Sequence, residues 1–190
     1  MKKLLVIDNY DSFTYNLVHI LEARGSYEVE VKRNDKVDAS YALQCDKIIL
    51  SPGPGIPSEA GNMMEIIKAI ATQKSILGVC LGHQALTEYF GGDLLNLTEV
   101  HHGVEGQLIK TDDDCPILRG IDKNFQAGRY HSWVSKKNNF PKELIVTSED
   151  EKGEIMSFRH ESLSVFGVQF HPESIMTPDG TMMIENFLKV

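Results

Sequence analysis

The feature that most constrains this chain is an alternation, over residues 1–92, of short apolar runs with longer segments of helical periodicity. Apolar runs occupy residues 4–7, 47–50 and 76–79, and each ends in polar residues, glycine or proline. Runs of this length suit buried parallel strands, and the segments between them supply the connecting helices. The pattern predicts an α/β fold with a mostly parallel sheet and helices on both of its faces.

The segments with helical periodicity are, in chain order, residues 13–23, 58–71, 83–90 and 181–190. Asp11 or Ser12 is expected to cap the first of these helices, and Gly25 is expected to end it. Residues 28–32 alternate in a way typical of a strand with one solvated face. The loops that follow the parallel strands are expected to gather at one edge of the sheet, where ligands bind in such folds.

Beyond residue 92 the pattern changes to short alternating or apolar segments separated by turn residues. These segments are residues 93–97, 106–110, 144–148, 154–158 and 163–169. They predict a mainly antiparallel β portion in the C-terminal half. The chain has no internal repeat, low-complexity tract or linker, and 190 residues suffice for one well-buried core. A single domain over residues 1–190 is therefore expected.

Charge and cysteine content exclude several classes of protein. The formal net charge is −8 without a basic block, which argues against nucleic acid or an anionic membrane as a partner. The three cysteines, Cys45, Cys80 and Cys115, lack C-x-x-C spacing, which favours a reducing compartment over a disulfide framework or structural zinc. The apolar run at 4–7 is too short for a signal peptide or a membrane span. We expect a cytoplasmic protein.

Four of the histidines are not expected to carry chemistry. His19 falls within the first predicted helix and His160 within a charged turn, so both are expected to be structural or solvated. His101 and His102 are adjacent and lack the spaced partners of a zinc site, so no metal is expected there. Cys45 and Cys115 are expected to be structural.

Cys80 stands where the strand at 76–79 meets the next helix, with Gly78 and Gly82 two positions to either side. Such glycines allow a tight turn that exposes the central side chain, as in the nucleophile elbow of the α/β-hydrolases. A helix that begins just after Cys80 favours its thiolate, and its free N–H groups can hold an oxyanion. On these residues alone, a small buried cysteine that packs a strand end remains an alternative.

A cysteine nucleophile needs a base, and the base needs a partner that holds its ring. His171 ends the apolar segment 165–170, and Pro172 stiffens the link to Glu173. In an extended backbone, residues two apart point the same way, so Glu173 is predicted to reach the His171 ring. The alternative is a histidine at a strand end followed by a surface glutamate.

Two motifs, GVCLGHQ at 78–84 and FHPES at 170–174, together resemble the class I (triad) glutamine amidotransferases. DNYDSF at 8–13, SPGPG at 51–55 and RYHS at 129–132 narrow the resemblance to the glutaminase subunit (component II) of anthranilate synthase and aminodeoxychorismate (p-aminobenzoate) synthase. The resemblance spans essentially the whole chain. It implies a flavodoxin-like sheet and hydrolysis of L-glutamine to glutamate and ammonia. It also implies a chorismate-binding synthase subunit as heteromeric partner, which uses the ammonia to make anthranilate or 4-amino-4-deoxychorismate.

Carried over position by position, the resemblance makes Cys80 the nucleophile, His171 the base and acid, and Glu173 the orienting residue. The backbone N–H groups of Gly53 and Leu81 are implied to form the oxyanion hole. The residues implied to bind glutamine are Gly53, Pro54, Gly55, Gln84, Ser132 and Trp133. The resemblance implies no cofactor and no metal on this chain, whereas the partner synthase subunit is expected to use Mg.

The chain departs from the family pattern at two places. Many relatives carry HGKTS where this chain has HGVEG at 102–106, and many carry leucine at the position of Trp133. The first departure is expected near the partner surface. Asp8, Tyr10 and Asp11 are expected to cap the first helix and to shape the loop beside the site, at an edge that also faces the partner.

Two other functions remain compatible with these residues. One is a free-standing cysteine hydrolase of γ-glutamyl compounds, against which the motifs outside the triad count. The other is a non-catalytic regulatory module of the same fold, against which the intact Cys80, His171 and Glu173 count. Both synthase products start from chorismate and ammonia, and their regiochemistry is set on the other subunit. The chain is therefore compatible with tryptophan synthesis, folate synthesis or both.

Overall fold

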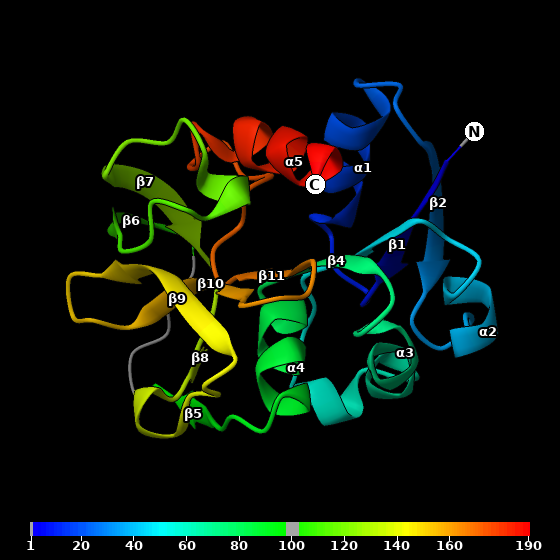
Figure 1. The fold of residues 1–190 in the computed structure, drawn as a ribbon, viewed down its shortest axis with the longest axis horizontal. Helices are drawn as coiled ribbons and strands as arrows, with labels where there is room; N and C mark the ends of the chain where they lie inside the picture. Colours follow the sequence, from blue (N-terminus) through cyan, green and yellow to red (C-terminus); the bar gives the residue numbers. More distant parts are fainter. Residues whose placement is uncertain (1, 98–102) are drawn as a thin grey trace.

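A computed structural model describes residues 2–97 and 103–190, in which the strands form one large mixed sheet and one small sheet (Figure 1). The large sheet contains β1 (Lys3–Asp8), β2 (Glu28–Arg33), β3 (Lys47–Leu50), β4 (Ser75–Val79), β6 (Val104–Lys110), β7 (Asn124–Arg129), β9 (Leu144–Asp150), β10 (Ile155–His160) and β11 (Val165–Val168). Their order across the sheet is β2-β1-β3-β4-β11-β10-β9-β6-β7. The small sheet pairs β5 (Leu94–Asn96) with β8 (Trp133–Ser135).

The large sheet changes character at β11. Strands β2, β1, β3 and β4 are parallel, as predicted, and β11 pairs parallel with β4 on one side. On its other side β11 pairs antiparallel with β10, and the sheet continues antiparallel to β7. The expectation that the C-terminal half is mainly antiparallel is thus confirmed, except that its segment 163–169 returns to extend the parallel part. This return places Val168 opposite Val79.

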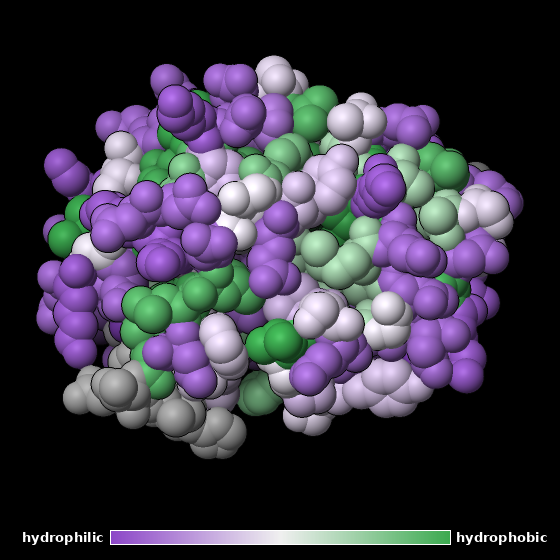
Figure 2. All heavy atoms as spheres, turned by 90° about the horizontal axis from the view of Figure 1, so that it is seen from below, coloured by the Kyte–Doolittle hydropathy of each residue, from purple (hydrophilic) through white to green (hydrophobic). Residues whose placement is uncertain are grey.

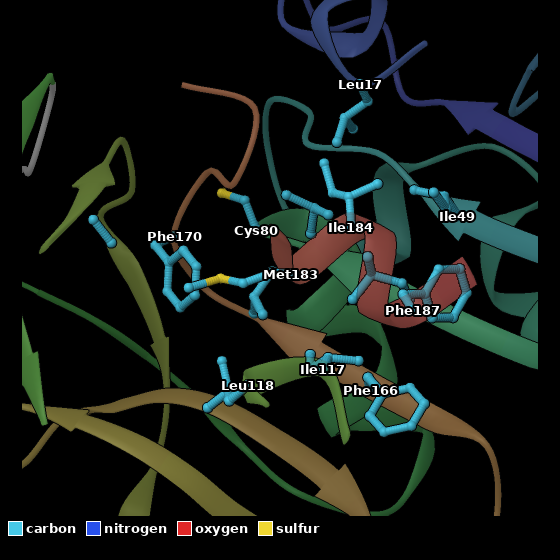
Figure 3. Close-up of a cluster of buried hydrophobic side chains, with 14 of the residues drawn as sticks. Leu17, Ile49, Cys80, Ile117, Leu118, Phe166, Phe170, Met183, Ile184 and Phe187 are labelled. Atoms are coloured by element: carbon cyan, nitrogen blue, oxygen red, sulfur yellow. The ribbon is translucent and has the colours of Figure 1, made fainter. Parts of the chain in front are cut away.

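Helices cover both faces of the parallel part (Figure 1). On one face lie α1 (Thr14–Glu22) and α5 (Gly180–Lys189), and on the other lie α3 (Met63–Ile70) and α4 (Leu81–Tyr89), with the short α2 (Ala39–Ala42) beside α3. Each face has its own apolar core. Figure 3 shows the first core, in which Leu17 of α1 and Ile184 and Phe187 of α5 are fully buried against the sheet. Burial of each such side chain stabilises the fold by about 1.5–3 kcal/mol.

Several predicted boundaries differ from the structure. The helix expected over 58–71 is a 3-10 turn at Pro57–Glu59 followed by α3. The interruption falls at Gly61, where φ is +54° and where a Cβ would lie 2.8 Å from the Asn34 Oδ1 atom. Asp11 does not cap α1 directly; its carboxylate accepts the Phe13 N–H at 2.8 Å and shapes the turn before the helix. Strands β7 and β8 were not predicted.

Charged and polar side chains dominate the face shown in Figure 2, and apolar side chains appear there in separate small groups. Within residues 2–97 and 103–190, no helix is both long enough and apolar enough to cross a membrane.

Candidate active site

Cys80 occupies the turn from β4 into α4 in a strained backbone conformation, with a φ of 50°. For a residue with a side chain such a conformation costs about 1–3 kcal/mol. The flanking glycines are needed because the helix start packs directly on the strand ends. A Cβ on Gly78 would lie 2.5 Å from the Gly82 carbonyl, and a Cβ on Gly82 would lie 2.5 Å from the Leu50 carbonyl oxygen. The predicted elbow is therefore present, with the strain on Cys80 itself.

His171 and Glu173 form the predicted pair. The His171 Nδ1 atom lies 2.7 Å from the Glu173 Oε1 atom, and both side chains are buried. The prediction of an extended backbone between these two residues is wrong. The backbone turns after His171, and the Ser174 N–H donates to the His171 carbonyl at 3.2 Å. The rings of Phe13 and Tyr130 pack edge-on against the imidazole, with centroids 5.3 and 4.8 Å away.

The protonation of His171 is governed by opposing effects. Burial disfavours the imidazolium, but the influence of the nearby Cys80 sulfur and of the Glu173 carboxylate outweighs it and raises the pKa of His171 to about 10. At neutral pH the ring is therefore a cation held between a sulfur and a carboxylate. A neighbouring imidazolium favours the thiolate, which is the nucleophilic form of cysteine.

A cavity of about 540 Å³ opens over Cys80 and His171. Its wall consists of residues 10–13 after β1, residues 52–54 after β3, and Tyr130 after β7. The predicted gathering of strand-end loops at one edge of the sheet is thus confirmed. Figure 3 shows Cys80 at the margin of the buried apolar cluster, with its sulfur pointing away from Phe187.

The loops after β1 and β3 are joined by hydrogen bonds from Asn9. Its side-chain Nδ2 donates to the Ser51 carbonyl at 2.8 Å, and its backbone N–H donates to the Ser51 Oγ at 2.9 Å. Gly53 lies against this junction, because a Cβ there would be 2.5 Å from the Asn9 Cβ and 2.8 Å from the Leu81 Cδ2. Gly53 and Leu81, the two residues predicted to donate to an oxyanion, are therefore neighbours in space.

The residues predicted to bind glutamine are distributed unevenly. Gly53 and Pro54 line the cavity together with Cys80. Gly55 is exposed and has a φ of +74°. Gln84 is buried rather than solvated: its Nε2 atom donates to the Trp133 carbonyl at 3.0 Å.

Ser132 and Trp133, also predicted to bind glutamine, immediately precede or begin β8 and are partly exposed. The strand is tied to α4 behind the site. The His83 Nε2 atom lies 2.9 Å from the Ser135 Oγ, and burial lowers the pKa of His83 to about 3. His83 is therefore neutral at physiological pH and joins the helix of Cys80 to the strand of Trp133.

The remaining candidates are structural. Cys45 and Cys115 are buried and unpaired, and burial raises the pKa of both thiols. His19 is exposed on α1, and the His160 Nδ1 atom accepts backbone N–H groups of the turn after β10. His101 and His102 lie outside the described residues. In the described part of the chain, no three His, Cys, Asp or Glu side chains are grouped so that they could hold a metal ion.

The structure adds three residues that the sequence did not single out. Phe13 and Tyr130 belong to motifs already noted, and both pack on the His171 ring. Gln169 lies within hydrogen-bonding distance of the Cys80 sulfur. Its contact with Cys80 follows from the register of β11 on β4, which no local sequence pattern encodes. Asp8 also proves central to its loop: its Oδ1 accepts from the Tyr10 N–H at 2.9 Å.

Comparisons with known proteins agree with this geometry. The family model described as "Glutamine amidotransferase class-I" matches residues 5–190. The "Aminodeoxychorismate/anthranilate synthase component 2" of Bacillus subtilis is 45% identical, over 98% of this chain and 95% of that protein. The "Anthranilate synthase component 2" of Pseudomonas putida is 44% identical, over 98% of this chain and 96% of that protein.

Solved structures share the fold. One from Thermoplasma acidophilum has a TM-score of 0.88 at 22% identity and covers 100% of this chain and 93% of its own. A glutamine amidotransferase from Thermotoga maritima has a TM-score of 0.78 at 16% identity, over 90% of this chain and 76% of its own. The resemblance noted in the motifs and the predicted α/β fold are thereby confirmed. The chain belongs to the class I glutamine amidotransferases.

Proposed function

We propose that this chain is the glutaminase subunit of a chorismate-using synthase. It hydrolyses L-glutamine to glutamate and ammonia and passes the ammonia to the chorismate-binding subunit. The observation that carries the proposal is the Cys80 side chain on a strained elbow, at one cavity with a His171 ring that Glu173 holds at 2.7 Å. Relatives named component 2 of such synthases, about as long as this chain, support the partner assignment.

In the proposed first half-reaction, the Cys80 thiolate attacks the side-chain carboxamide carbon of glutamine. The backbone N–H groups of Leu81 and Gly53 hold the tetrahedral oxyanion, and loss of one such donor typically raises the barrier by about 3–4 kcal/mol. The His171 imidazolium gives its proton to the departing nitrogen as the C–N bond breaks. Ammonia leaves, and a γ-glutamyl thioester remains on Cys80.

In the second half-reaction, neutral His171 takes a proton from water, and the resulting hydroxide attacks the thioester carbonyl. The C–S bond breaks, glutamate leaves, and the thiolate and imidazolium are restored. Glu173 holds the ring in one orientation throughout and stabilises its charged form. No metal or cofactor is required on this chain. The partner subunit is proposed to use Mg.

Recognition of glutamine is proposed to use Gly53 and Pro54, which line the cavity, together with Gly55, Gln84, Ser132 and Trp133. The hydrogen bonds of Gln84 restrict its role. Both of its amide N–H groups are used, by the Trp133 carbonyl and by the Gln169 Oε1. Its own Oε1 is then the atom that meets a substrate, and as an acceptor it suits the α-ammonium group of glutamine.

The proposed setting is the cytoplasm, where three unpaired cysteines are compatible with a reducing environment. The pathway depends on the partner, because chorismate is aminated on the other subunit. Tryptophan synthesis, folate synthesis and a subunit shared by both are the three possibilities.

The test is to mix the chain with each candidate synthase subunit from its source, supply chorismate and glutamine, and identify the aromatic product. Anthranilate with one partner assigns tryptophan synthesis, aminodeoxychorismate assigns folate synthesis, and both products indicate a shared subunit. The matched control is the Cys80→Ser chain with ammonium in place of glutamine, which should still support product formation.

If neither product forms, although the synthases are active on free ammonia, the partner assignment is refuted. Rapid turnover of γ-glutamyl peptides by the isolated chain would then favour a free-standing hydrolase. Failure of a glutamine-analogue electrophile to label Cys80, even with the synthase present, would instead favour a non-catalytic module.

A further inference from the structure

Gln169 is a fully buried polar side chain that the reaction scheme leaves unused. It directly follows β11, and its backbone N–H donates to the Met156 carbonyl at 2.8 Å. Because Val168 lies opposite Val79 in parallel register, the next residues, Gln169 and Cys80, lie side by side. The Gln169 Nε2 atom is 3.7 Å from the Cys80 Sγ, which is within hydrogen-bonding distance for sulfur.

The direction of the Gln169 amide follows from its neighbours. The backbone carbonyl of Trp133 can only accept, so the Gln84 amide must turn its nitrogen toward it, at 3.0 Å. The second N–H of that nitrogen donates to the Gln169 Oε1 at 3.3 Å. With its oxygen so occupied, Gln169 presents its NH₂ group to the Cys80 sulfur.

We propose that Gln169 is a second hydrogen-bond donor to the nucleophile, and that Gln84 and Gln169 form an amide relay from the Trp133 carbonyl to the Cys80 sulfur. The proposal rests on the proposed function, in which Cys80 attacks glutamine. The sulfur then lies between the His171 ring and the Gln169 amide. A donor to a thiolate favours the charged form and fixes the direction in which the sulfur points.

The relay differs in kind from the His171 contact. His171 gives up its proton during the reaction, so its support of the sulfur changes from step to step. Gln169 has no proton to transfer, and it continues to donate while the C–S bond forms and breaks. The relay also begins at Trp133, which belongs to the proposed glutamine pocket, so the orientation of the nucleophile is linked to the pocket wall.

The test compares two substitutions in the full-length chain. Gln169→Met keeps the length of the side chain but has no N–H, and Gln169→Glu keeps its shape but turns an acceptor toward the sulfur. The readout is the rate of Cys80 alkylation by iodoacetamide from about pH 5 to 10, with the modified residue identified by peptide mass spectrometry. This readout needs neither glutamine nor a partner subunit.

We expect Gln169→Met to move the midpoint of the Cys80 alkylation profile up by about one unit, and so to slow alkylation about 10-fold at pH values below that midpoint. Gln169→Glu should slow it further, to about 100-fold, since a carboxylate repels a thiolate. Gln84→Met removes the orienting partner without touching the sulfur and should shift the profile in the same direction, about 3-fold in rate.

The matched control is Gln73→Glu, the same chemical change at an exposed glutamine, which should keep the unsubstituted profile. If Gln169 only fills space, Gln169→Met will keep that profile too, and this result would overturn the proposal. If no synthase gives a product with this chain, but Gln169→Met still alters the Cys80 alkylation profile, the proposed function is refuted. The role of Gln169 as a donor to the Cys80 sulfur is then retained.

A measurement on the unsubstituted protein tests the same proposal even if the variants do not fold. The side-chain NH₂ resonance of Gln169 in an isotope-labelled chain should shift with pH over the range in which Cys80 alkylation rises, and should shift again once Cys80 is alkylated. A resonance that responds to neither change would overturn the proposal.

Discussion

Two buried pairs of polar or charged side chains in the described part of the chain are held differently. At the carboxyl edge of the parallel strands, His171 and Glu173 meet Cys80 beside a cavity. In the antiparallel part, Arg129 and Asp150 pair at 2.8 Å, and both side chains are at least nine-tenths buried. The remaining oxygen of Asp150 accepts two backbone N–H groups, from Lys152 at 2.9 Å and from Glu154 at 2.8 Å.

The difference lies in the backbone and in access. Among the described residues, the two non-glycine positions with positive φ are Tyr10 and Cys80, and both line the cavity. The Arg129–Asp150 pair lies on the regular strands β7 and β9, and neither residue lines the cavity. The Arg129–Asp150 pair therefore holds regular strands together, whereas His171 lies beside a cavity and next to the strained Cys80, where its proton is available for transfer.

The strongest way to separate the two regions is to remove the nucleophile. Cys80→Ser should lower kcat for glutamine hydrolysis by about 10⁴-fold or more, because a serine hydroxyl beside this histidine is a far weaker nucleophile than a thiolate. The midpoint of thermal unfolding should change little, since shape and burial are kept. Steady-state ammonia release and thermal unfolding measure the two effects, and turnover at the native rate would refute the scheme.

The converse change breaks the structural pair. Asp150→Ala leaves the Arg129 guanidinium buried without its carboxylate and should lower the free energy of unfolding by about 3–5 kcal/mol in urea titrations. The folded fraction should keep kcat within about 3-fold, because neither residue lines the cavity.

A matched control for this change is Asp113→Ala, which removes an exposed partner of Lys110 and should cost at most about 1 kcal/mol. If Asp150→Ala proved as mild as this control, the ion pair would not hold the antiparallel part together.

Glu173→Gln sharpens the distinction, because it changes a buried charge without removing a side chain. His171 has a pKa of about 10, so its imidazolium, needed to protonate ammonia, persists at neutral pH and is lost as pH rises through about 10. The same sign holds for stability: this contribution is complete below the unfolded-state pKa of about 6.5 and fades as pH passes about 10.

With Glu173→Gln, one of the groups that raise this pKa disappears. The alkaline limb of kcat/KM should move toward neutral pH, and kcat/KM at pH 8 should fall about 100-fold. A pH–rate profile of the synthase complex measures both. An unmoved alkaline limb would mean that Glu173 does not act on the charge of His171.

The two regions also differ in how far sequence predicts them. Strands β1, β3 and β4 were placed to within one residue at each end, because strands buried on both faces are continuous apolar runs. The pairing of β11 with β4 was missed, because it joins segments about 90 residues apart and no local pattern encodes it. Strand β7 was missed because the alternation of its first residues breaks down at Ala127–Gly128.

The site shows the same division between local motif and long-range packing. Cys80, His171 and Glu173 could be named because their motifs are short and specific. Gln169 and Tyr130 could not, since their contacts depend on strand register and on the turn after β7. For Gly53, predicted to donate to an oxyanion, the sequence did not reveal the close contacts with Asn9 and Leu81.

The smallest expected effect comes from the other buried cysteines, which serve as internal controls for Cys80. Cys115 is also fully buried, but burial raises its pKa, so it stays a thiol at neutral pH. Cys115→Ala should cost about 1 kcal/mol in unfolding free energy and leave kcat unchanged. Under native conditions near pH 7, iodoacetamide should modify one cysteine per chain quickly in the unsubstituted protein and in Cys115→Ala, and none in Cys80→Ser.

Mass spectrometry of the intact chain counts these modifications directly. Fast labelling of Cys45 or Cys115 would show that burial alone does not set thiol reactivity here, and that the strained elbow and the imidazolium are not what distinguish Cys80. Slow labelling of both Cys45 and Cys115 would show that burial does not explain the reactivity of Cys80. The difference would then lie in the strained conformation of Cys80 and in its two neighbours, His171 and Gln169.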